Sequence, residues 1–315
     1  MAAAIETSRL TPAAPKTLDR YRTVTAFVSG AAPAALIVIV LTLLQQAAPA
    51  ISNYGLAFLV RSVWNPVTLD FGALPYIYGT VVTSAFAIII ALPVGLSVAL
   101  LLAEQGAQGI RGAIGTGIEL LAAIPSVVYG IWALFVVAPF SLRYLETPIT
   151  ERLGFIGFLS GPPRQYSFFT ASLVLAIMIL PTLAAVSRDV IRAVPRGLRE
   201  SSTALGATWW ETTWRVILPT ARAGIFGATV LALGRALGET IAVTMVIGNR
   251  DEIPPSVFSP GYTLASKIAN EFSEATGNLY PAALIELGLV LILVTLTVNL
   301  VALLLVRSTQ ARMAA

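Results

Sequence analysis

Six long runs of apolar residues dominate the chain, and charged or proline- and glycine-rich segments separate them. A helix needs about 20 mostly apolar residues to cross the hydrocarbon core of a bilayer, and each run is long enough to do so. The pattern therefore predicts an all-α, polytopic membrane protein with six transmembrane helices. The predicted spans are 24–44, 79–102, 119–140, 168–186, 224–247 and 285–306.

The composition indicates the same class of protein. Of the 315 residues, 57% are hydrophobic and 11% are charged, whereas a soluble domain carries about 25% charged residues. A water-facing surface cannot be built from so few charges, so most of the surface must face lipid. The formal net charge of +4 does not indicate a nucleic-acid partner, because the basic residues lie at the ends of the apolar runs and form no patch of their own.

The residue types that the chain lacks exclude several kinds of chemistry. It has no cysteine and no histidine, which excludes disulfides, thiolate chemistry, histidine-ligated metals and histidine bases. Its only lysines, Lys16 and Lys267, do not lie in a G-x-x-x-x-G-K-[ST] phosphate loop. We therefore expect no cofactor on this chain; if ATP drives the protein, ATP and Mg²⁺ bind to partner subunits. No paired carboxylates, metal-ligand clusters or nucleophile–base pairs favour a membrane enzyme.

The basic residues also predict how the chain is oriented in the membrane. If the N-terminus is cytoplasmic, thirteen of the twenty lysines and arginines lie in cytoplasmic segments and six lie in outer loops, while Arg235 lies within the fifth span. The opposite orientation would reverse this ratio. The sequence therefore predicts a multi-pass protein of the cytoplasmic (inner) membrane with both termini in the cytoplasm. Its first apolar run is too long for a secretory signal and is expected to be an uncleaved anchor.

The cytoplasmic loop at about 187–223 is long, charged and helical in character. Pro195 can begin a helix, Gly206 can end one and Pro219 can stop the next, which predicts two short amphipathic helices joined by a turn. Such a helix can insert into a groove on a partner protein or lie on anionic lipid, held there by its arginines. The pattern alone does not favour either alternative.

This loop resembles the EAA loop of binding-protein-dependent ABC importer permeases. The usual family pattern is Glu-Ala-Ala, three residues, Gly, nine residues, Ile, one residue and Leu-Pro. The chain departs from it mildly, with Ser201 and Ser202 for the alanines and Val216 for the isoleucine. The resemblance implies that the loop docks into an ATPase subunit. The residues to which it assigns this coupling role are Glu200, Ser201, Ser202, Gly206, Leu218 and Pro219.

A closer resemblance covers most of the chain from about residue 75 onward. The segments 176–181, 187–190, 234–240, 242–249 and 263–266 are similar to those of PstC-type permeases of phosphate-specific ABC transporters. The resemblance implies a type I ABC importer permease fold with a cytoplasmic coupling helix, so that a cytoplasmic tail (1–22) precedes a transmembrane permease domain (23–315).

The same resemblance implies a function and partners. It implies ATP-driven import of inorganic phosphate by alternating access, together with a second permease (PstA-type), two ATPase subunits (PstB-type) and an extracytoplasmic phosphate-binding protein (PstS-type). One alternative is an ABC permease for another oxyanion. The other is an ion-coupled anion transporter or channel, which would explain the helices and Arg235 but not the EAA-like spacing.

Arg235 and Glu239 are the candidate substrate-pathway residues. At 3.6 residues per turn, two residues four apart on one helix share a face, about 6 Å apart along its axis. An arginine near the bilayer centre costs at least about 2.5–3.5 kcal/mol, so it should face the protein interior or a water-filled path. Its planar fork of donors suits an oxyanion, and Glu239 would accept a hydrogen bond from protonated phosphate. The alternative is an ion pair that only fixes helix packing.

Other features have simpler interpretations. Gly224, Gly227, Gly234 and Gly238 predict close helix packing against another subunit, and Glu119 and Glu286 are expected at the membrane interface. The outer segment after the fifth span predicts an ordered loop and a short amphipathic helix near 263–274. Either this loop or the one at 45–78 could receive a binding protein, and the sequence does not decide between that role and simple connection.

Overall fold

The computed structural model describes residues 16–104 and 108–314 of the chain. Contacts within it define two units, Met1–Gln46 and Ala47–Ala315. The first unit consists, where it is described, of the exposed first part of helix α1 (Lys16–Tyr54). Residues 1–15 of the predicted tail lie outside the described residues, and residues 16–22 are helical. The division into a tail (1–22) and a permease domain (23–315) stays a prediction.

The prediction of six membrane-crossing helices is confirmed. Among the described residues, six helices are long and apolar enough to cross a bilayer. Each helix is longer than the predicted span, because the prediction counted only the roughly 20 residues that the hydrocarbon core requires. They are Val24–Leu59, Leu74–Ala103, Ser126–Leu153, Phe168–Arg192, Trp209–Leu237 and Leu279–Leu304.

Several of these helices consist of shorter elements that follow one another directly. In chain order after α1, the elements are η1 (Gly55–Leu59), β1 (Trp64–Asn65), β2 (Asp70–Phe71), α2 (Leu74–Ala103), α3 (Gln108–Ala123), α4 (Ser126–Trp132), η2 (Ala133–Val137), α5 (Ala138–Ser141), η3 (Leu142–Glu146), α6 (Thr147–Leu153), η4 (Gly157–Leu159), α7 (Phe168–Arg192), α8 (Arg196–Ala204), α9 (Trp209–Thr212), η5 (Thr213–Ile217), α10 (Leu218–Leu237), α11 (Ile241–Val246), α12 (Leu264–Glu271) and α13 (Leu279–Ala314).

Two predicted span boundaries were wrong. The third span was expected from residue 119, but α3 ends at Ala123 and the spanning helix begins at Ser126, after the extended Pro125. The fifth span was expected over 224–247, but α10 ends at Leu237 and α11 follows as a separate short helix. Proline and glycine can either kink or end a helix within an apolar run, and hydropathy does not distinguish these outcomes.

Wide π-type helical turns precede three of the prolines. In η2, η3 and η5 the backbone N–H groups of Ala138, Thr147 and Leu218 bond carbonyls five residues earlier. Each of these residues directly precedes a proline, namely Pro139, Pro148 and Pro219. A proline in an α-helix has no N–H, and its ring clashes with the carbonyl four residues back. A single wider turn provides room for the ring, so the helix continues through the proline.

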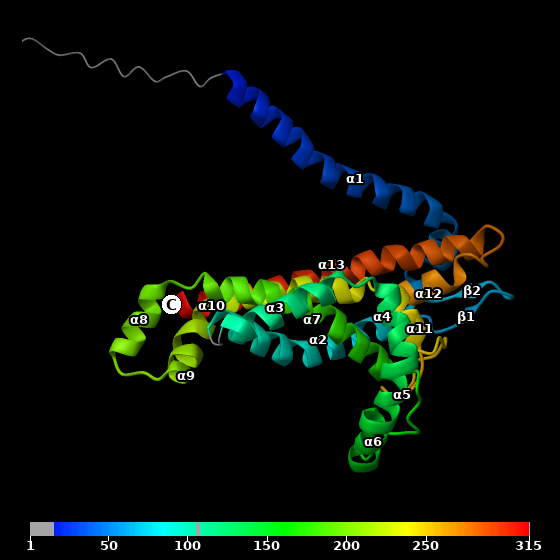
Figure 1. Ribbon diagram of the computed structural model, residues 1–315. Helices are drawn as coiled ribbons and strands as arrows, with labels where there is room; N and C mark the ends of the chain where they lie inside the picture. Colours follow the sequence, from blue (N-terminus) through cyan, green and yellow to red (C-terminus); the bar gives the residue numbers. More distant parts are fainter. Residues whose placement is uncertain (1–15, 105–107, 315) are drawn as a thin grey trace, which may run out of the picture. The chain divides into compact units, whose positions relative to one another are not determined.

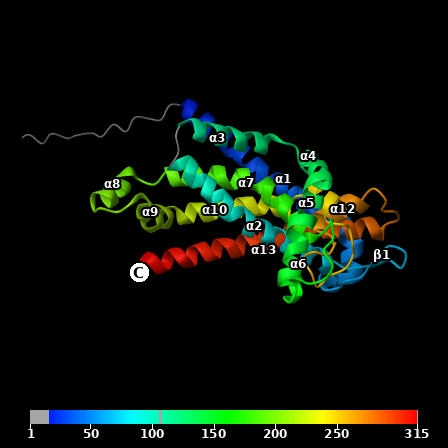
Figure 2. The same ribbon diagram turned by 60° about the horizontal axis from the view of Figure 1, so that its bottom comes forward.

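Helices α2, α7, α10 and α13 run alongside one another and form the centre of the second unit (Figure 1; Figure 2). Helix α7 is the most buried of the six spans, and small side chains allow close approach to it. A Cβ added at Gly224 of α10 would lie 2.3 Å from a methyl group of Val190. The loop bearing α8 and α9 lies at one end of this unit, and β1, β2, α11 and α12 lie at the other (Figure 1; Figure 2).

A cap, called the outer cap after the orientation that the sequence predicts, closes the end that carries β1, β2 and α12. We use this name for residues 55–73 and 247–278 together. The predicted amphipathic helix near 263–274 is confirmed as α12, and Thr263 caps it in a reciprocal pair with Ser266. Aromatic and aliphatic side chains of both cap segments form one core with the start of α13; among its members are Phe58, Trp64, Phe71, Tyr76, Tyr262 and Tyr280.

A buried lysine lies at the centre of this cap. The side chain of Lys267 is 0% exposed, and its Nζ lies 2.6 Å from an oxygen of Asp251 and is also ion-paired with Glu271. Three rings surround the ammonium group at 4.7–5.2 Å from their centroids, those of Trp64, Tyr76 and Tyr262. Cation–π attraction and two carboxylates thus replace the water that a buried ammonium group loses.

The same carboxylates also accept hydrogen bonds from the rings of the cap. The hydroxyl of Tyr76 donates to Asp251 at 2.7 Å, and the indole of Trp64 donates to Glu271 at 2.9 Å. Burial, and to a smaller extent these two carboxylates, raise the pKa of Tyr262 to about 12. Its hydroxyl therefore stays neutral at physiological pH. The network joins the loop after η1, the start of α2 and the segment around α12 into one assembly.

Replacing this lysine with an apolar residue should destabilise the cap strongly. In Lys267→Met the methylene stem keeps its packing, but Asp251 and Glu271 lose their shared cation. Breaking one partner of a buried ion pair typically costs about 3–5 kcal/mol, so we expect a lower thermal unfolding temperature of the purified protein in detergent. Arg250→Gln, which removes one partner of the exposed Arg250–Glu252 pair, is the control. Equal unfolding temperatures for the two variants would contradict this account.

A buried acidic side chain joins the third span to the start of α7. Glu146, the last residue of η3, is fully buried, and the sequence analysis did not single it out. Its Oε1 accepts hydrogen bonds from Ser141 at 3.0 Å, Ser167 at 3.2 Å and Thr170 at 2.7 Å. Ser167 also caps α7 by accepting from the Thr170 backbone. The carboxyl group thus gathers hydroxyls from two helices at one point.

The acceptor, rather than the negative charge, should matter at this position. Glu146→Gln keeps an oxygen for the hydroxyls, whereas Glu146→Leu leaves them without it. An unsatisfied buried polar group costs about 1–3 kcal/mol, so thermal unfolding in detergent should show a loss for Leu and a small change for Gln. A loss of the same size in both variants would show that the ionised carboxylate is required.

Candidate functional site

The loop that the sequence analysis singled out forms a compact projection at one end of the bundle. Helix α8 begins directly after Pro195, as predicted. It ends where Gly206 adopts φ +85°, a left-handed conformation. The N–H of Gly206 bonds the carbonyl of Thr203 at 3.0 Å, and that of Ala207 bonds Ser202 at 3.2 Å, which is the Schellman termination of a helix. Glycine is needed here because a Cβ disfavours this backbone conformation.

The second predicted helix of the loop is the first part of a longer one. Thr208 caps α9 in a capping box with Glu211. The prediction that Pro219 stops this helix was wrong, because α9 continues through η5 into α10 without a break. Leu218 and Pro219 are therefore the first residues of α10. The wide turn of η5 accommodates the proline, so the loop is joined rigidly to a membrane-spanning helix.

The residues for which the sequence resemblance implies a coupling role differ in exposure. Glu200, Ser201 and Gly206 are exposed, as a contact surface requires. Ser202 is half-buried, and its hydroxyl lies 2.9 Å from that of Thr212 in α9. The serine that departs from the usual alanine thus fastens α8 to α9. Large apolar side chains also face outward over this loop, among them Leu198, Leu205 (90% exposed), Trp210 and Trp214.

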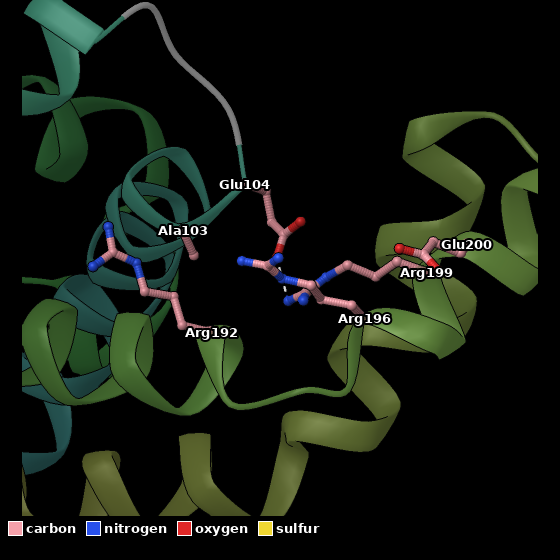
Figure 3. Close-up of a pocket in the computed structure, with 6 residues that line it drawn as sticks. All are labelled: Ala103, Glu104, Arg192, Arg196, Arg199 and Glu200. Atoms are coloured by element: carbon pink, nitrogen blue, oxygen red, sulfur yellow. Dashed lines mark hydrogen bonds and ion pairs between the residues drawn. The ribbon is translucent and has the colours of Figure 1, made fainter.

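A pocket of about 520 Å³ lies between this loop and the adjoining helix ends (Figure 3). Three arginines and two glutamates from the end of α2, the end of α7 and the start of α8 surround it. Its lining residues are Ala103, Glu104, Arg192, Arg196, Arg199 and Glu200. Glu104 and Arg199 meet there in an ion pair of 2.6 Å. Sequence reasoning missed this pair, because 95 residues separate its members.

Arg235 lies in the last turn of α10, beside a separate groove between α10 and α13. This groove has a volume of about 540 Å³, and Gly227, Gly234, Arg235 and Asn299 are among its lining residues. The Arg235 side chain is exposed in the single chain and approaches the Thr182 hydroxyl at 3.5 Å. A cation in the last turn of a helix also interacts favourably with the negative end of the helix dipole. The position therefore leaves its guanidinium accessible from the groove.

The predicted shared helical face of Arg235 and Glu239 was wrong. Helix α10 ends at Leu237 with Gly238 as its C-cap, so Glu239 lies in the break before α11. Within residues 16–104 and 108–314, no ion pair joins the two side chains. The apolar run of the predicted fifth span thus forms two helices, α10 and α11, with Glu239 between them.

The remaining candidates are only partly as expected. Gly224 packs within the chain, against Val190, whereas a Cβ at Gly227 or Gly234 would meet nothing within 4 Å. These two glycines thus leave an open face, and their packing on another subunit stays a prediction. Glu286 was expected at the interface but is 7% exposed, eight residues into α13. Among the described residues, no acidic cluster could hold a metal ion.

Comparison with a protein family assigns most of the chain. Residues 91–315 match the family described as binding-protein-dependent transport system inner membrane component. The phosphate transport system permease protein PstC of Mesorhizobium japonicum is 48% identical, covering 80% of this chain and 79% of that protein. PstC of Haemophilus influenzae is 42% identical, covering 87% and 88%, respectively.

Solved structures show the same fold. A permease chain of a bacterial alginate ABC transporter, in complex with an alginate-bound periplasmic protein, superimposes with a TM-score of 0.60 at 19% identity, covering 91% of this chain and 94% of that one. An inward-facing MetNI methionine ABC transporter chain gives 0.54 at 18% identity, covering 80% and 96%. The fold is that of a type I ABC importer permease, and the chain belongs to the binding-protein-dependent transport system inner membrane components and, among them, to the PstC permeases.

Proposed function

We propose that this permease carries inorganic phosphate into the cell across the cytoplasmic membrane by alternating access. The observation that carries the proposal is the identity of 42–48% to permeases of phosphate transport systems over most of the chain. The rigid projection of α8 and α9, with exposed Glu200 and outward-facing tryptophans, supports an importer driven by another subunit. The choice of phosphate over another oxyanion as the substrate rests on these relatives.

The proposal includes an assembly. A second, PstA-type permease would pack against the open glycine face beside Arg235. Two PstB-type ATPase subunits would bind ATP and Mg²⁺, and one of them would receive α8. A PstS-type phosphate-binding protein would dock on the outer cap. The basic residues support an orientation with both termini in the cytoplasm. In this orientation α8 would lie on the ATP side of the membrane and the cap on the other side.

Arg235 and Glu239 have a proposed role in the substrate path. The guanidinium of Arg235 faces a groove and offers a fork of donors that suits two phosphate oxygens. Glu239 lies at the helix break just beyond it. A carboxylate there would accept a hydrogen bond from protonated phosphate and would repel fully ionised sulfate.

Uptake of labelled phosphate in cells that lack this chain tests the proposal. Restoring the chain should restore uptake, and sulfate in excess should compete weakly. ATPase subunits should also co-purify with the chain. If the chain restores uptake of sulfate or molybdate but not of phosphate, the proposed substrate is wrong. If the chain transports without any ATPase, the proposed mechanism is wrong.

The left-handed turn at Gly206 provides a test of docking. Gly206→Val should strain the turn by about 1–2 kcal/mol and misplace the exposed end of α8, so that fewer ATPase subunits co-purify. Gly206→Asn is the matched control, because asparagine tolerates this conformation. Full co-purification and normal transport in the valine variant would show that this turn does not take part in docking.

Arg235→Lys provides a test of substrate contact. Lysine keeps the charge but loses the planar fork; a lost charge-assisted hydrogen bond of about 1.5–3 kcal/mol corresponds to roughly a tenfold to hundredfold weaker interaction. We therefore expect strongly reduced phosphate uptake with normal insertion and assembly. Arg143→Lys, a change at another exposed arginine within a span, should leave uptake near normal. Near-normal uptake by Arg235→Lys would leave only the packing role for this residue.

A further inference from the structure

Helices α2 and α7 end beside the docking loop, and their ends are linked to each other. The last turns of α-helices leave carbonyl groups without intrahelical donors. Arg192, the last residue of α7, donates from Nη2 to the carbonyl of Leu102 in the last turn of α2, at 2.9 Å. Pro195 follows closely and has no N–H to offer. The carbonyl of Ile191 accepts the backbone N–H of Val194 at 3.3 Å, and it and the carbonyl of Val194 can still accept side-chain donors.

Arg199 of α8 supplies these donors. Its Nη1 donates to the carbonyl of Val194 at 2.9 Å, and its Nη2 donates to that of Ile191 at 2.7 Å. The same Nη2 lies 2.6 Å from Oε1 of Glu104, which caps the end of α2. One planar guanidinium thus joins α8 to the ends of both α7 and α2. We call this group, Arg199 with Glu104 and the two carbonyls, the arginine clamp.

The position of Glu104 needs an explanation that packing alone does not give. A carboxylate at the C-terminal end of a helix lies at the negative end of the helix dipole, which is unfavourable. The Glu104 side chain is also only 10% exposed, and that of Arg199 is 22% exposed. Little water therefore screens the pair, and it is stronger than an ion pair on an open surface. The ion pair offsets the unfavourable position and fixes α8 to α2.

The clamp does not form a binding site for an anion. Arg199 is already engaged by a carboxylate and two carbonyls, and Arg192 by a third carbonyl. The pocket also contains two glutamates, Glu104 and Glu200, and two helix C-termini, which repel negative charge. The geometry favours a mechanical link.

We propose that Arg199 is a positioning residue through which movement of α8 is transmitted to α2. The inference rests on the proposed function, in which an ATPase subunit moves α8. Helix α2 has 30 residues, about 45 Å at 1.5 Å per residue. At its other end, Tyr76 is held by the Lys267 network. The clamp therefore connects the docking loop to the outer cap through a single helix.

The test uses the complete transporter in proteoliposomes, with phosphate uptake and ATP hydrolysis measured together. Glu104→Gln removes the charge that holds α2 but leaves the carbonyl bonds of Arg199 to α7. We expect the ratio of phosphate transported to ATP hydrolysed to fall about fivefold or more, a typical size for coupling between sites. Assembly and basal ATPase activity should stay close to wild type. Asp189→Asn, which removes an exposed carboxylate from a pair with Arg188 on α7, is the matched control and should not change the ratio.

A double reversal keeps the proposal testable if a single variant assembles poorly. Glu104→Arg combined with Arg199→Glu restores an ion pair between α2 and α8, so its transport ratio should exceed that of either single reversal. An unchanged ratio in Glu104→Gln, or equal losses of assembly, hydrolysis and transport, would overturn the link. Failure of the wild-type transporter to carry phosphate would instead overturn the proposed substrate. In that case stimulation of ATP hydrolysis by the binding protein still reports on the clamp.

Discussion

Every backbone polar group inside a lipid bilayer must find its hydrogen-bond partner within the protein, and this constraint governs the structure. It explains why six runs of apolar sequence become helices rather than loops. It also explains how the chain tolerates prolines that would otherwise interrupt those helices. At Pro139, Pro148 and Pro219 the chain widens one turn and continues the helix. Where α2 and α7 end, arginine side chains donate to carbonyls of the last turns, those of Leu102 and Ile191.

The sequence predicted the existence of the six membrane helices and of α8 correctly, because both depend on local signals. Apolar runs are read directly, and Pro195 and Gly206 mark the bounds of α8 by their own backbone preferences. The shared face of Arg235 and Glu239 could not be predicted reliably. It depended on whether the helix continues past Gly238, and residues elsewhere in the fold decide that.

Long-range pairs were beyond reach for a different reason. The carboxylates and rings that surround Lys267 come from three separate stretches of the chain. Glu104 pairs with Arg199, which lies 95 positions away. A single lysine in an outer loop resembles any solvated charge in the sequence. Only the fold shows that it is enclosed by rings. Phosphate was inferred as the substrate from the sequence resemblance and from the relatives, because the geometry of a single permease chain shows only part of a substrate path.

The wide turns have a consequence for comparing this chain with its relatives. A π-type turn contains about one residue more than an α-turn, so it rotates everything beyond it by roughly 100° about the helix axis. The third span has two such turns, η2 and η3. Its final segment is thus rotated by roughly 200° relative to an uninterrupted helix of the same sequence. A helical wheel drawn through the whole span would place the residues of α6 (Thr147–Leu153) on nearly the opposite side, and relatives that lack Pro139 or Pro148 should align there with gaps of single residues.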